Sequence, residues 1–350
     1  TGIILQATGP IFGTFGVGSG GAVYQTPGEV YITATSASSM SGSTGGGMAA
    51  GFSFLDTVMT QAATIDTNSN LWASAIIDRS DRTSTGSSRG YHQTSHGGAF
   101  GGALMQTGDA TVGLAGGFID TTVDTVTGSS KTRIDGFNLA AYGTYRLGGT
   151  VLTAVLSGAY QDQDVSRNVL VGGVVSQAKG SPKAWLGGAG FGIARPVALE
   201  RGFTLTPKAN IGWLHMSRDA YSETGGGNAA MSVDQIATDT VRGQVGAELS
   251  LMIKNPNDMW SVRPNIHAGL AREWRGGDKE TTGTFAGVFV ATGQGFRTQL
   301  DNRDQTYMAI GAGVDVTVGH GITAFAGYDG SVGGDAERSG GFRIGARLAL

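Results

Sequence analysis

The side chains with the greatest potential for chemistry in this sequence are its five histidines. His92 and His96 stand four residues apart, a spacing that can hold a metal ion on a helix. These two residues fall, however, in an expected loop and at the start of a strand, and no third ligand accompanies them. Solvated histidines are therefore the favoured interpretation. The remaining histidines are His215, His267 and His320.

A dense group of charges, Asp78-Arg79-Ser80-Asp81-Arg82, is the second candidate. Two neighbouring carboxylates can form an acid pair for hydrolysis, and such a cluster can also bind a partner at a loop. A hydrated rim with internal ion pairs is the simpler interpretation. The run Gly225-Gly226-Gly227 has no Lys-Ser/Thr after it and lacks a phosphate-binding fingerprint. We expect no catalytic residue, no metal site and no cofactor.

Composition excludes further classes. The 350 residues carry a net charge of −3, which leaves no basic stripe for nucleic acid. The chain has no Cys, so thiolate metal sites and disulfides are excluded. No apolar run reaches about 18 residues, so no transmembrane helix is predicted. The 61 glycines are spread over the whole chain and favour interrupted strands with many turns.

The first part of the chain differs from the rest in composition and in residue pattern. Residues 1–47 are poor in charge and contain one alternating run, at 29–35, that predicts a strand. The stretch 36–47 is rich in Gly and Ser and predicts a linker. Because the chain begins at Thr1, without Met or a signal peptide, we expect it to be a piece of a longer protein.

Residues 48–65 show the helical spacing that is most persuasive in this chain, and a helix is expected over 48–66. An amphipathic helix packed on a soluble core is the simpler interpretation of this segment. The residues that define its faces are Phe52, Leu55, Val58 and Met59 on the apolar stripe and Asp56 beside it.

The region 70–350 consists of segments of about ten residues that alternate in polarity. Short and long connections between these segments strictly alternate. The short ones are 106–109, 147–150, 199–202, 255–258 and 319–321, and the long ones are 79–93, 121–132, 162–182, 218–238, 274–304 and 330–338. This order predicts an all-β fold, a transmembrane antiparallel up-and-down β-barrel of about twelve strands, with all short turns at one rim.

The alternation also separates two faces. In the last segment Phe342, Ile344, Ala346, Leu348 and Leu350 share the apolar face, which we expect to lie in lipid. A charge that faces lipid near the midplane costs about 2–4 kcal/mol, and every charge in the five clearest segments lies on the other face. A soluble sandwich alternates as well, but aromatic residues such as Trp72, Trp185, Trp213 and Tyr145 lie near segment ends, as in interfacial girdles.

The opposite face should line the lumen. Buried charges need partners, so Glu248 is expected to pair with Arg242, Arg263 or Arg343. Two interpretations stay open: these side chains grip a helix in the lumen, or they hydrate a pore. The lumen-lining residues expected are Lys208, Arg242, Gln244, Glu248, Arg263, Asn265, Asp315, Arg343 and Arg347.

The sequence resembles a known family, the translocator domain of type V secretion autotransporters of Gram-negative bacteria. The matching features are the helix at 48–65, the opening Asn70-Leu71-Trp72-Ala73, the segment 326–331 and the ending 341–350. The resemblance implies an N-terminal α-helix threaded through the barrel lumen, with residues 1–47 as the remnant of a passenger domain. Some relatives cleave themselves at paired Asn residues in the helix; 48–65 contains no such pair, so self-cleavage by that route is not expected.

The resemblance also implies partners and a location. The barrel should lie in the bacterial outer membrane, among its lipid and lipopolysaccharide, with long loops extracellular and the C-terminus periplasmic. The outward residues of the last strand, from Phe342 to Leu350, should be the signal that the barrel-assembly machinery reads. Family members usually end on Phe or Trp, whereas this chain ends on Leu350.

Three functions are compatible with this sequence. The first is an outer-membrane translocator that secretes or anchors its own N-terminal passenger, and the helix directly before the first strand favours it. The second is a passive outer-membrane channel with an N-terminal plug. The third is an outer-membrane hydrolase at the long-loop rim, which the lack of a His–Asp constellation disfavours.

Overall fold

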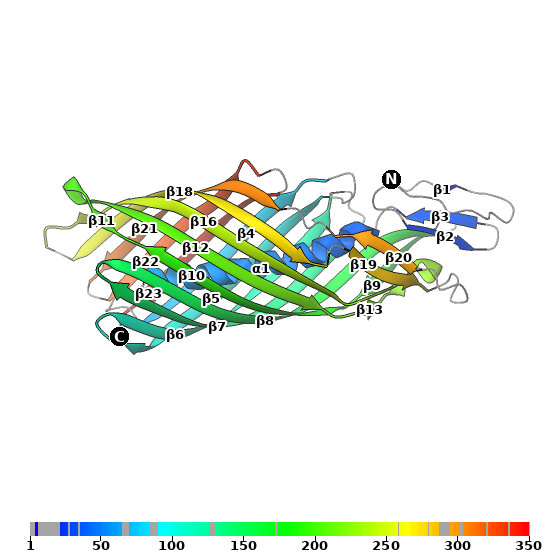
Figure 1. The fold of residues 1–350 in the computed structure, drawn as a ribbon, viewed down its shortest axis with the longest axis horizontal. Helices are drawn as coiled ribbons and strands as arrows, with labels where there is room; N and C mark the ends of the chain where they lie inside the picture. The colour runs from blue at the N-terminus through cyan, green and yellow to red at the C-terminus, as the bar shows by residue number, and fades with distance from the viewer. Residues whose placement is uncertain are drawn as a thin grey trace.

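The structure, a computed structural model, shows a closed β-barrel around a helix (Figure 1). It describes residues 4–5, 22–26, 29–33, 36–64, 70–84, 90–126, 130–171, 174–257, 259–278, 280–286, 295–300, 304–319, 321–334 and 337–349. Within these residues the predicted fold is confirmed, since twelve long antiparallel strands close into one barrel.

The barrel closes without a free edge, as a membrane-spanning sheet must. Its last strand pairs with its first, with Leu348 opposite Leu71, and β8 pairs directly with β10. The twelve strands are β4 (Leu71–Arg82), β5 (Tyr91–Gln106), β6 (Ala110–Thr125), β7 (Ser130–Leu147), β8 (Thr150–Val171), β10 (Lys183–Ala194), β12 (Phe203–Arg218), β16 (Ile236–Leu251), β18 (Trp260–Gly277), β21 (Gln305–Val318), β22 (Ile322–Val332) and β23 (Glu337–Leu348).

The connections alternate between two rims, as predicted. We call the rim of the short connections the short-turn rim; it carries β11 (Val197–Ala198), η1 (Glu200–Gly202) and β17 (Ile253–Lys254). At the opposite, long-loop rim, the strands run further than predicted. Much of the loops expected at 79–93, 121–132 and 162–182 is strand, because ladder pairing continues after the apolar alternation ends.

The longest strands continue into a folded extension at the long-loop rim, which we call the cap. It consists of the end of β8, β9 (Val174–Gly180), β13 (Tyr221–Ser222), β14 (Thr224–Gly225), η2 (Gly227–Ala229), β15 (Met231–Val233), β19 (Glu280–Phe285) and β20 (Gly295–Gln299). Its buried core includes Val169, Tyr221, Met231 and Phe285, together with Met40 of the helix. The cap therefore encloses the part of the helix that emerges from the barrel.

The N-terminal region holds a small sheet and the lumenal helix. Strands β1 (Ile4–Leu5), β2 (Ala22–Thr26) and β3 (Glu29–Thr33) pair in the order β1-β3-β2, and β3 corresponds to the strand predicted at 29–35. Helix α1 (Ser36–Thr64) covers most of the predicted helix but begins earlier. The linker predicted at 36–47 is therefore wrong. Among the described residues, no helix is both long and apolar enough to span a membrane.

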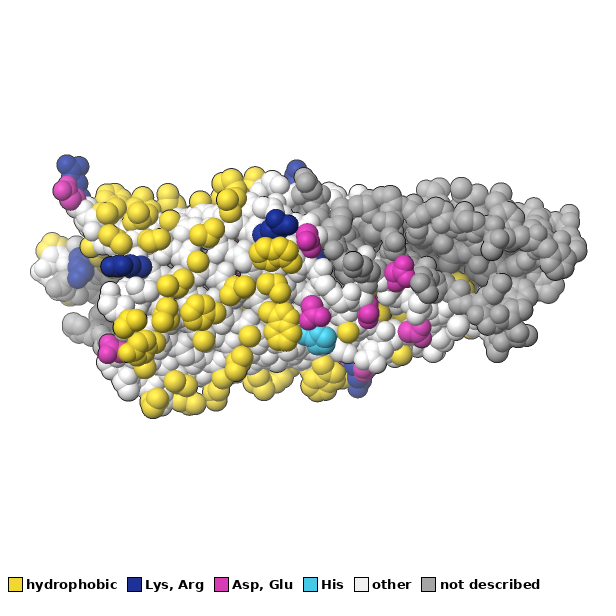
Figure 2. Space-filling model, in the orientation of Figure 1, with side chains coloured by type: hydrophobic (Ala, Val, Ile, Leu, Met, Phe, Trp, Pro, Cys, Tyr) yellow, Lys and Arg dark blue, Asp and Glu magenta, His cyan; other side chains and the backbone are white. Residues whose placement is uncertain are grey.

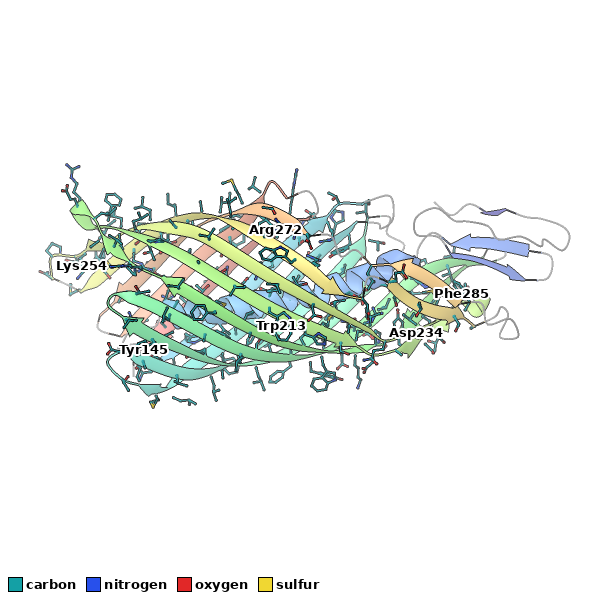
Figure 3. All side chains as sticks on the ribbon, in the orientation of Figure 1. Tyr145, Trp213, Asp234, Lys254, Arg272 and Phe285 are labelled. Atoms are coloured by element: carbon teal, nitrogen blue, oxygen red, sulfur yellow. The ribbon has the colours of Figure 1, made fainter. Side chains whose placement is uncertain are left out.

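A broad band of apolar side chains covers the visible outer surface of the barrel (Figure 2). Tyr145 and Trp213 project outward from it, whereas Asp234 and Phe285 lie in the cap (Figure 3). The prediction that Trp72 belongs to an interfacial girdle is wrong, because Trp72 is only 3% exposed and faces the lumen. The segment 71–82 has apolar side chains on both faces, so alternation alone could not assign its direction.

The outer band predicts a position-dependent cost of charge. Val245 lies within it, 60% exposed, and is paired with Ala209 on β12 and with the exposed Leu270 on β18. A Val245→Arg substitution should destabilise the folded barrel in lipid vesicles by about 2–4 kcal/mol, because its charge would face hydrocarbon. The measurement is urea unfolding followed by tryptophan fluorescence.

The matched control is Val175→Arg, since Val175 is 68% exposed but lies on β9 in the cap. There the new charge meets water, and stability should stay within about 0.5 kcal/mol of the original protein. Equal losses at both positions would contradict the placement of the band.

Candidate functional site

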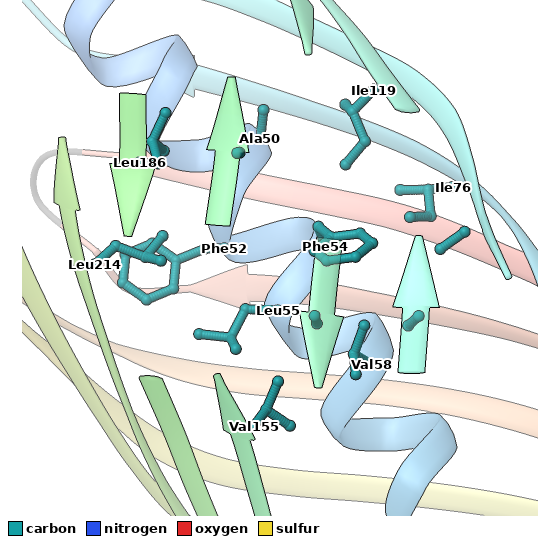
Figure 4. Close-up of a cluster of buried hydrophobic side chains, with 14 of the residues drawn as sticks. Ala50, Phe52, Phe54, Leu55, Val58, Ile76, Ile119, Val155, Leu186 and Leu214 are labelled. Atoms are coloured by element: carbon teal, nitrogen blue, oxygen red, sulfur yellow. The ribbon is translucent and has the colours of Figure 1, made fainter. Parts of the chain in front are cut away.

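The candidate site is the barrel lumen and the helix inside it. Helix α1 does not run along the centre: it packs against the wall formed by β5, β6, β7, β8, β10 and β12. Its side chains Phe52, Leu55 and Val58 are buried against this wall, with Met59 partly buried beside them (Figure 4). We call β5, β6, β7, β8, β10 and β12 the packed wall. The polar wall, which α1 contacts less, is formed by β16, β18, β21, β22 and β23.

In the N-terminal half of α1, glycines meet large side chains of the packed wall. A Cβ on Gly46 would lie 2.6 Å from Val123 Cγ2, and one on Gly47 would lie 2.5 Å from Gln161 Oε1. Neither neighbour is free to move, because both are almost completely buried. These helix positions therefore admit no side chain, which sequence patterning did not reveal.

In the C-terminal half of α1 the relation is reversed, with large helix residues against glycines of the wall. A Cβ on Gly190 would lie 3.3 Å from Leu55 Cδ1 and clash with the Met59 sulfur. Gly212 is similarly close to Phe52 and Leu55. Small and large residues thus alternate between helix and wall along the lumen, which fixes the axial position of α1.

Two arginines of the polar wall bind the helix. The Arg242 Nη2 lies 2.5 Å from the Asp56 carboxylate, and its guanidinium stacks over the Phe52 ring at 4.2 Å. The Arg347 Nε donates to the Gln61 side-chain oxygen at 2.9 Å. Asp56, Arg242 and Arg347 were singled out from the sequence, and in the structure they link α1 to the polar wall.

The charge cluster at Asp78–Arg82 is divided by strand alternation. Asp78 points into the lumen, where it accepts a hydrogen bond from Ser53 of α1. Arg79 and Asp81 lie on the outer face, and Asp81 contacts His92 at 2.5 Å. The hydrated rim expected here is therefore only half correct, since Asp78 belongs to the helix contacts.

Other polar contacts hold the N-terminal half of α1. The Gln161 Nε2 donates to the Gly47 carbonyl oxygen at 3.0 Å. Ser43 donates to the Gln163 side-chain oxygen at 3.0 Å and accepts from the Arg218 Nη1 at 2.8 Å. Sequence analysis missed these residues because it placed Ser43 and Gly47 in a linker.

The remaining lumenal charges form a network on the polar wall and on the adjoining strand β12. Glu248 lies 3.7 Å from Arg263, one of the three alternative partners expected, and 3.4 Å from Lys208, which was not expected as a partner. Arg242 binds the helix instead, and Arg343 binds Asp329, which strand patterning had not singled out. The network is completed by Asp315, 3.3 Å from both Arg263 and Arg347, and by the half-buried Gln244 and Asn265.

The histidines take separate places. His92 and His96 lie on the outer face of β5, and His96 is 3.9 Å from Asp120. His267 lies in the lumen, 2.7 Å from Asp329. The described residues contain no group of three or more potential metal ligands. His320 lies outside the described residues.

The last strand, β23, presents Phe342, Ile344 and Leu348 outward, all exposed, whereas Ala346 is half-buried on the same face. Its other face carries Arg343 and Arg347 toward the lumen. The terminal Leu350 lies outside the described residues.

A family model, described as the autotransporter beta-domain, matches residues 71–329. The chain belongs to this family. Three solved structures of the same kind share the fold. The translocator domain of autotransporter NalP from Neisseria meningitidis is 18% identical, with a TM-score of 0.67 over 87% of this chain and 97% of that one.

The transport unit of the autotransporter AIDA-I from Escherichia coli is 17% identical, with a TM-score of 0.61 over 85% of this chain and 98% of that one. The β-domain of the Bordetella autotransporter BrkA is 18% identical, with a TM-score of 0.59 over 81% and 100% of the two chains. No curated protein matched. The barrel is an autotransporter translocator of the outer membrane, which secretes its own passenger.

The fit between α1 and the packed wall of the translocator predicts that Gly46→Leu unseats the helix. Overpacking of this kind costs about 1–3 kcal/mol, and here the new side chain would overlap Val123. Single-channel conductance in planar bilayers should rise, and protease should cut α1.

A second substitution tests the cause. In a double variant, Val123→Ala should partly restore the packing of α1 that Gly46→Leu disrupts, because it removes the methyl groups that the new leucine overlaps. Thr60→Leu is the control, since Thr60 is an exposed side chain of the same helix. Gly46→Leu with wild-type conductance and protease resistance would contradict the fit.

Lumenal charges that contact the helix and lumenal charges that contact only the wall should give different phenotypes when they are removed. Arg242→Met removes the contacts to Asp56 and Phe52, so it should loosen α1 and raise the rate of transient pore opening. Glu248→Gln should change ion selectivity while α1 stays seated, because Glu248 contacts only wall residues. Both variants are measured for conductance and ion selectivity in planar bilayers. A change of selectivity alone in Arg242→Met, with pore opening in Glu248→Gln, would disprove these roles.

Proposed function

We propose that this barrel secretes its passenger and then retains α1 as a plug and a tether in the lumen. The observation that carries the proposal is the path of the chain through the barrel. Helix α1 begins among cap residues, with Met40 in the cap core, and ends near the short-turn rim, where Gln61 meets Arg347. The chain therefore enters α1 from the long-loop side of the barrel.

The proposal includes an orientation. We place the long-loop rim at the cell exterior and the short-turn rim, with the C-terminal end of β23, at the periplasmic side. Residues 1–47 are then the passenger's end and the start of the plug. The lumenal helix residues Phe52, Leu55, Asp56, Val58 and Met59 are proposed to hold the plug, and the polar wall to hydrate the space beside it.

A passive channel is the alternative function, but it has less support. The helix is held in the lumen by buried apolar contacts and by hydrogen bonds to several strands. We also propose that the barrel acts by transport alone, without covalent chemistry. The lumenal charges from Lys208 to Arg347 are already paired with the helix or with other charges of the wall.

The proposed partners follow from the outer surface. The apolar band suits outer-membrane lipid, and Arg272 over the Trp274 ring, at 5.5 Å, offers a cation beside an interfacial aromatic for lipopolysaccharide. The outward residues Phe342, Ile344, Ala346, Leu348 and Leu350 are proposed as the signal for the barrel-assembly machinery.

Single cysteines test the orientation, because the chain has no Cys of its own. Gln235→Cys lies in the cap region and Gly108→Cys in a short turn; both sites are open to solvent. In intact Gram-negative cells, a membrane-impermeant maleimide should label Gln235→Cys and leave Gly108→Cys unlabelled.

Permeabilised cells give the control, since both positions should then react. An epitope placed before Ser36 in the full-length protein should be accessible to antibody on intact cells. Labelling of Gly108→Cys alone in intact cells would reverse the orientation, and an inaccessible epitope would overturn the tether.

A further inference from the structure

Two fully buried arginines lie where the barrel meets the cap, Arg167 near the end of β8 and Arg218 at the end of β12. They differ in what their guanidinium groups bind. Arg167 uses the edge formed by Nε and Nη2 to grip Glu223: Nε lies 2.8 Å from one carboxylate oxygen and Nη2 lies 2.6 Å from the other. Glu223 also accepts from the Met231 backbone N–H at 2.9 Å. This is the side-on fork with which arginine chelates an anion.

Arg218, at the end of β12, presents the same fork without an internal acceptor. Its side chain is 0% exposed. Only Nη1 is engaged, by Ser43 of α1 at 2.8 Å. The buried Nε and Nη2 atoms have no hydrogen-bond partner, and no carboxylate among the described residues lies within ion-pair distance of Arg218. The one buried carboxylate in this part of the cap, Glu223, is taken by Arg167.

Further donors surround the fork. The Arg218 guanidinium lies 5.4 Å from the centre of the Tyr221 ring. The Tyr221 hydroxyl is buried without a partner, as is the Arg167 Nη1. Burial raises the pKa of Tyr221 above its ordinary value, so at neutral pH the hydroxyl keeps its proton and is a donor. The cluster has donors in excess and one positive charge more than its single carboxylate neutralises.

Such a cluster is costly unless an anion completes it. A buried cation needs a partner, and an unsatisfied buried donor in a native structure points to an ion or water. Apolar side chains border the cluster: Met40 and Ala178, both fully buried, share the cap core with Tyr221, over whose ring Arg218 lies. A spherical halide needs less room than a tetrahedral oxyanion, so a closely packed interior favours the halide.

We propose that the cap holds a chloride ion, chelated by the Nε and Nη2 of Arg218. Because the third nitrogen of the same guanidinium holds Ser43, the ion ties the cap to the N-terminal half of α1. This proposal is independent of the secretion and tethering proposed above, because a barrel with the opposite orientation in the membrane would bind the ion equally well.

Bromide is the probe for the site itself. Crystals of the full chain grown in sodium bromide should give an anomalous peak beside Arg218 Nε and Nη2. The same crystals of Arg218→Met should lack it. A protein without a peak at Arg218, or with bromide at surface sites only, would overturn the proposal and would leave water as the occupant.

Thermal unfolding in detergent is the second measurement. At constant ionic strength, exchange of gluconate for chloride should raise the melting temperature of the wild-type protein in a saturable manner, because the ion binds only the folded state. Arg218→Met should lose this dependence.

Arg272→Met is the matched control, since Arg272 is an exposed arginine on the outer surface, and it should keep the chloride response. If Arg218→Met fails to fold, the wild-type response to chloride and the bromide peak still decide the question. An equal response in wild type and both variants would assign the effect to general screening.

Discussion

The close packing of α1 against one wall of the barrel is the constraint on which the rest of the structure depends. Twelve strands fix the width of the lumen, and an α-helix with ordinary side chains is about 10–12 Å across. The two fit only because bulk alternates between them, with glycines on the helix at Gly46 and on the wall at Gly190. A shift by one turn would put Ala50 at the level of Gly46, where the wall leaves no room for a methyl group.

The off-centre position of α1 explains the charge distribution of the barrel. The packed wall meets the helix mainly through apolar and small residues, with polar contacts from Gln161, Gln163 and Arg218 to its N-terminal half. The opposite wall is left beside a polar space, where its charged side chains stay partly exposed. There charges are kept because each has a partner: Asp315 bridges Arg263 and Arg347, and Arg347 also holds Gln61 of the helix. Removal of one member would leave its neighbours with fewer partners in a confined space, which is more costly than the loss of a surface ion pair.

The sequence was sufficient to predict the barrel, but not how the helix and the charges inside it pack. Alternation and connection lengths predicted the twelve strands and the lumenal side of residues such as Glu248, because lipid allows few exceptions at outward positions. It could not predict which charges pair, because pairing depends on the register between strands: Arg263 reaches Glu248 from the neighbouring β18, whereas Arg242 lies six residues away on the same strand. The start of α1 was missed because glycine is a poor helix former, and only the side chains of distant strands, such as Val123 and Gln161, give these glycines a reason to be helical.

This poor intrinsic propensity also bears on how one segment can both pass through a barrel and stay in it. Each glycine costs about 1 kcal/mol relative to alanine in a helix, and the N-terminal half of α1 carries five between Gly42 and Gly51. Outside the barrel this half gains no compensating contacts, so it favours an extended chain, which is narrower than a helix. Inside, the wall supplies the packing and the hydrogen bonds from Gln161 and Arg218. Helix formation is thus coupled to arrival at one position, and the segment that offers least resistance to passage is held most specifically once it has stopped.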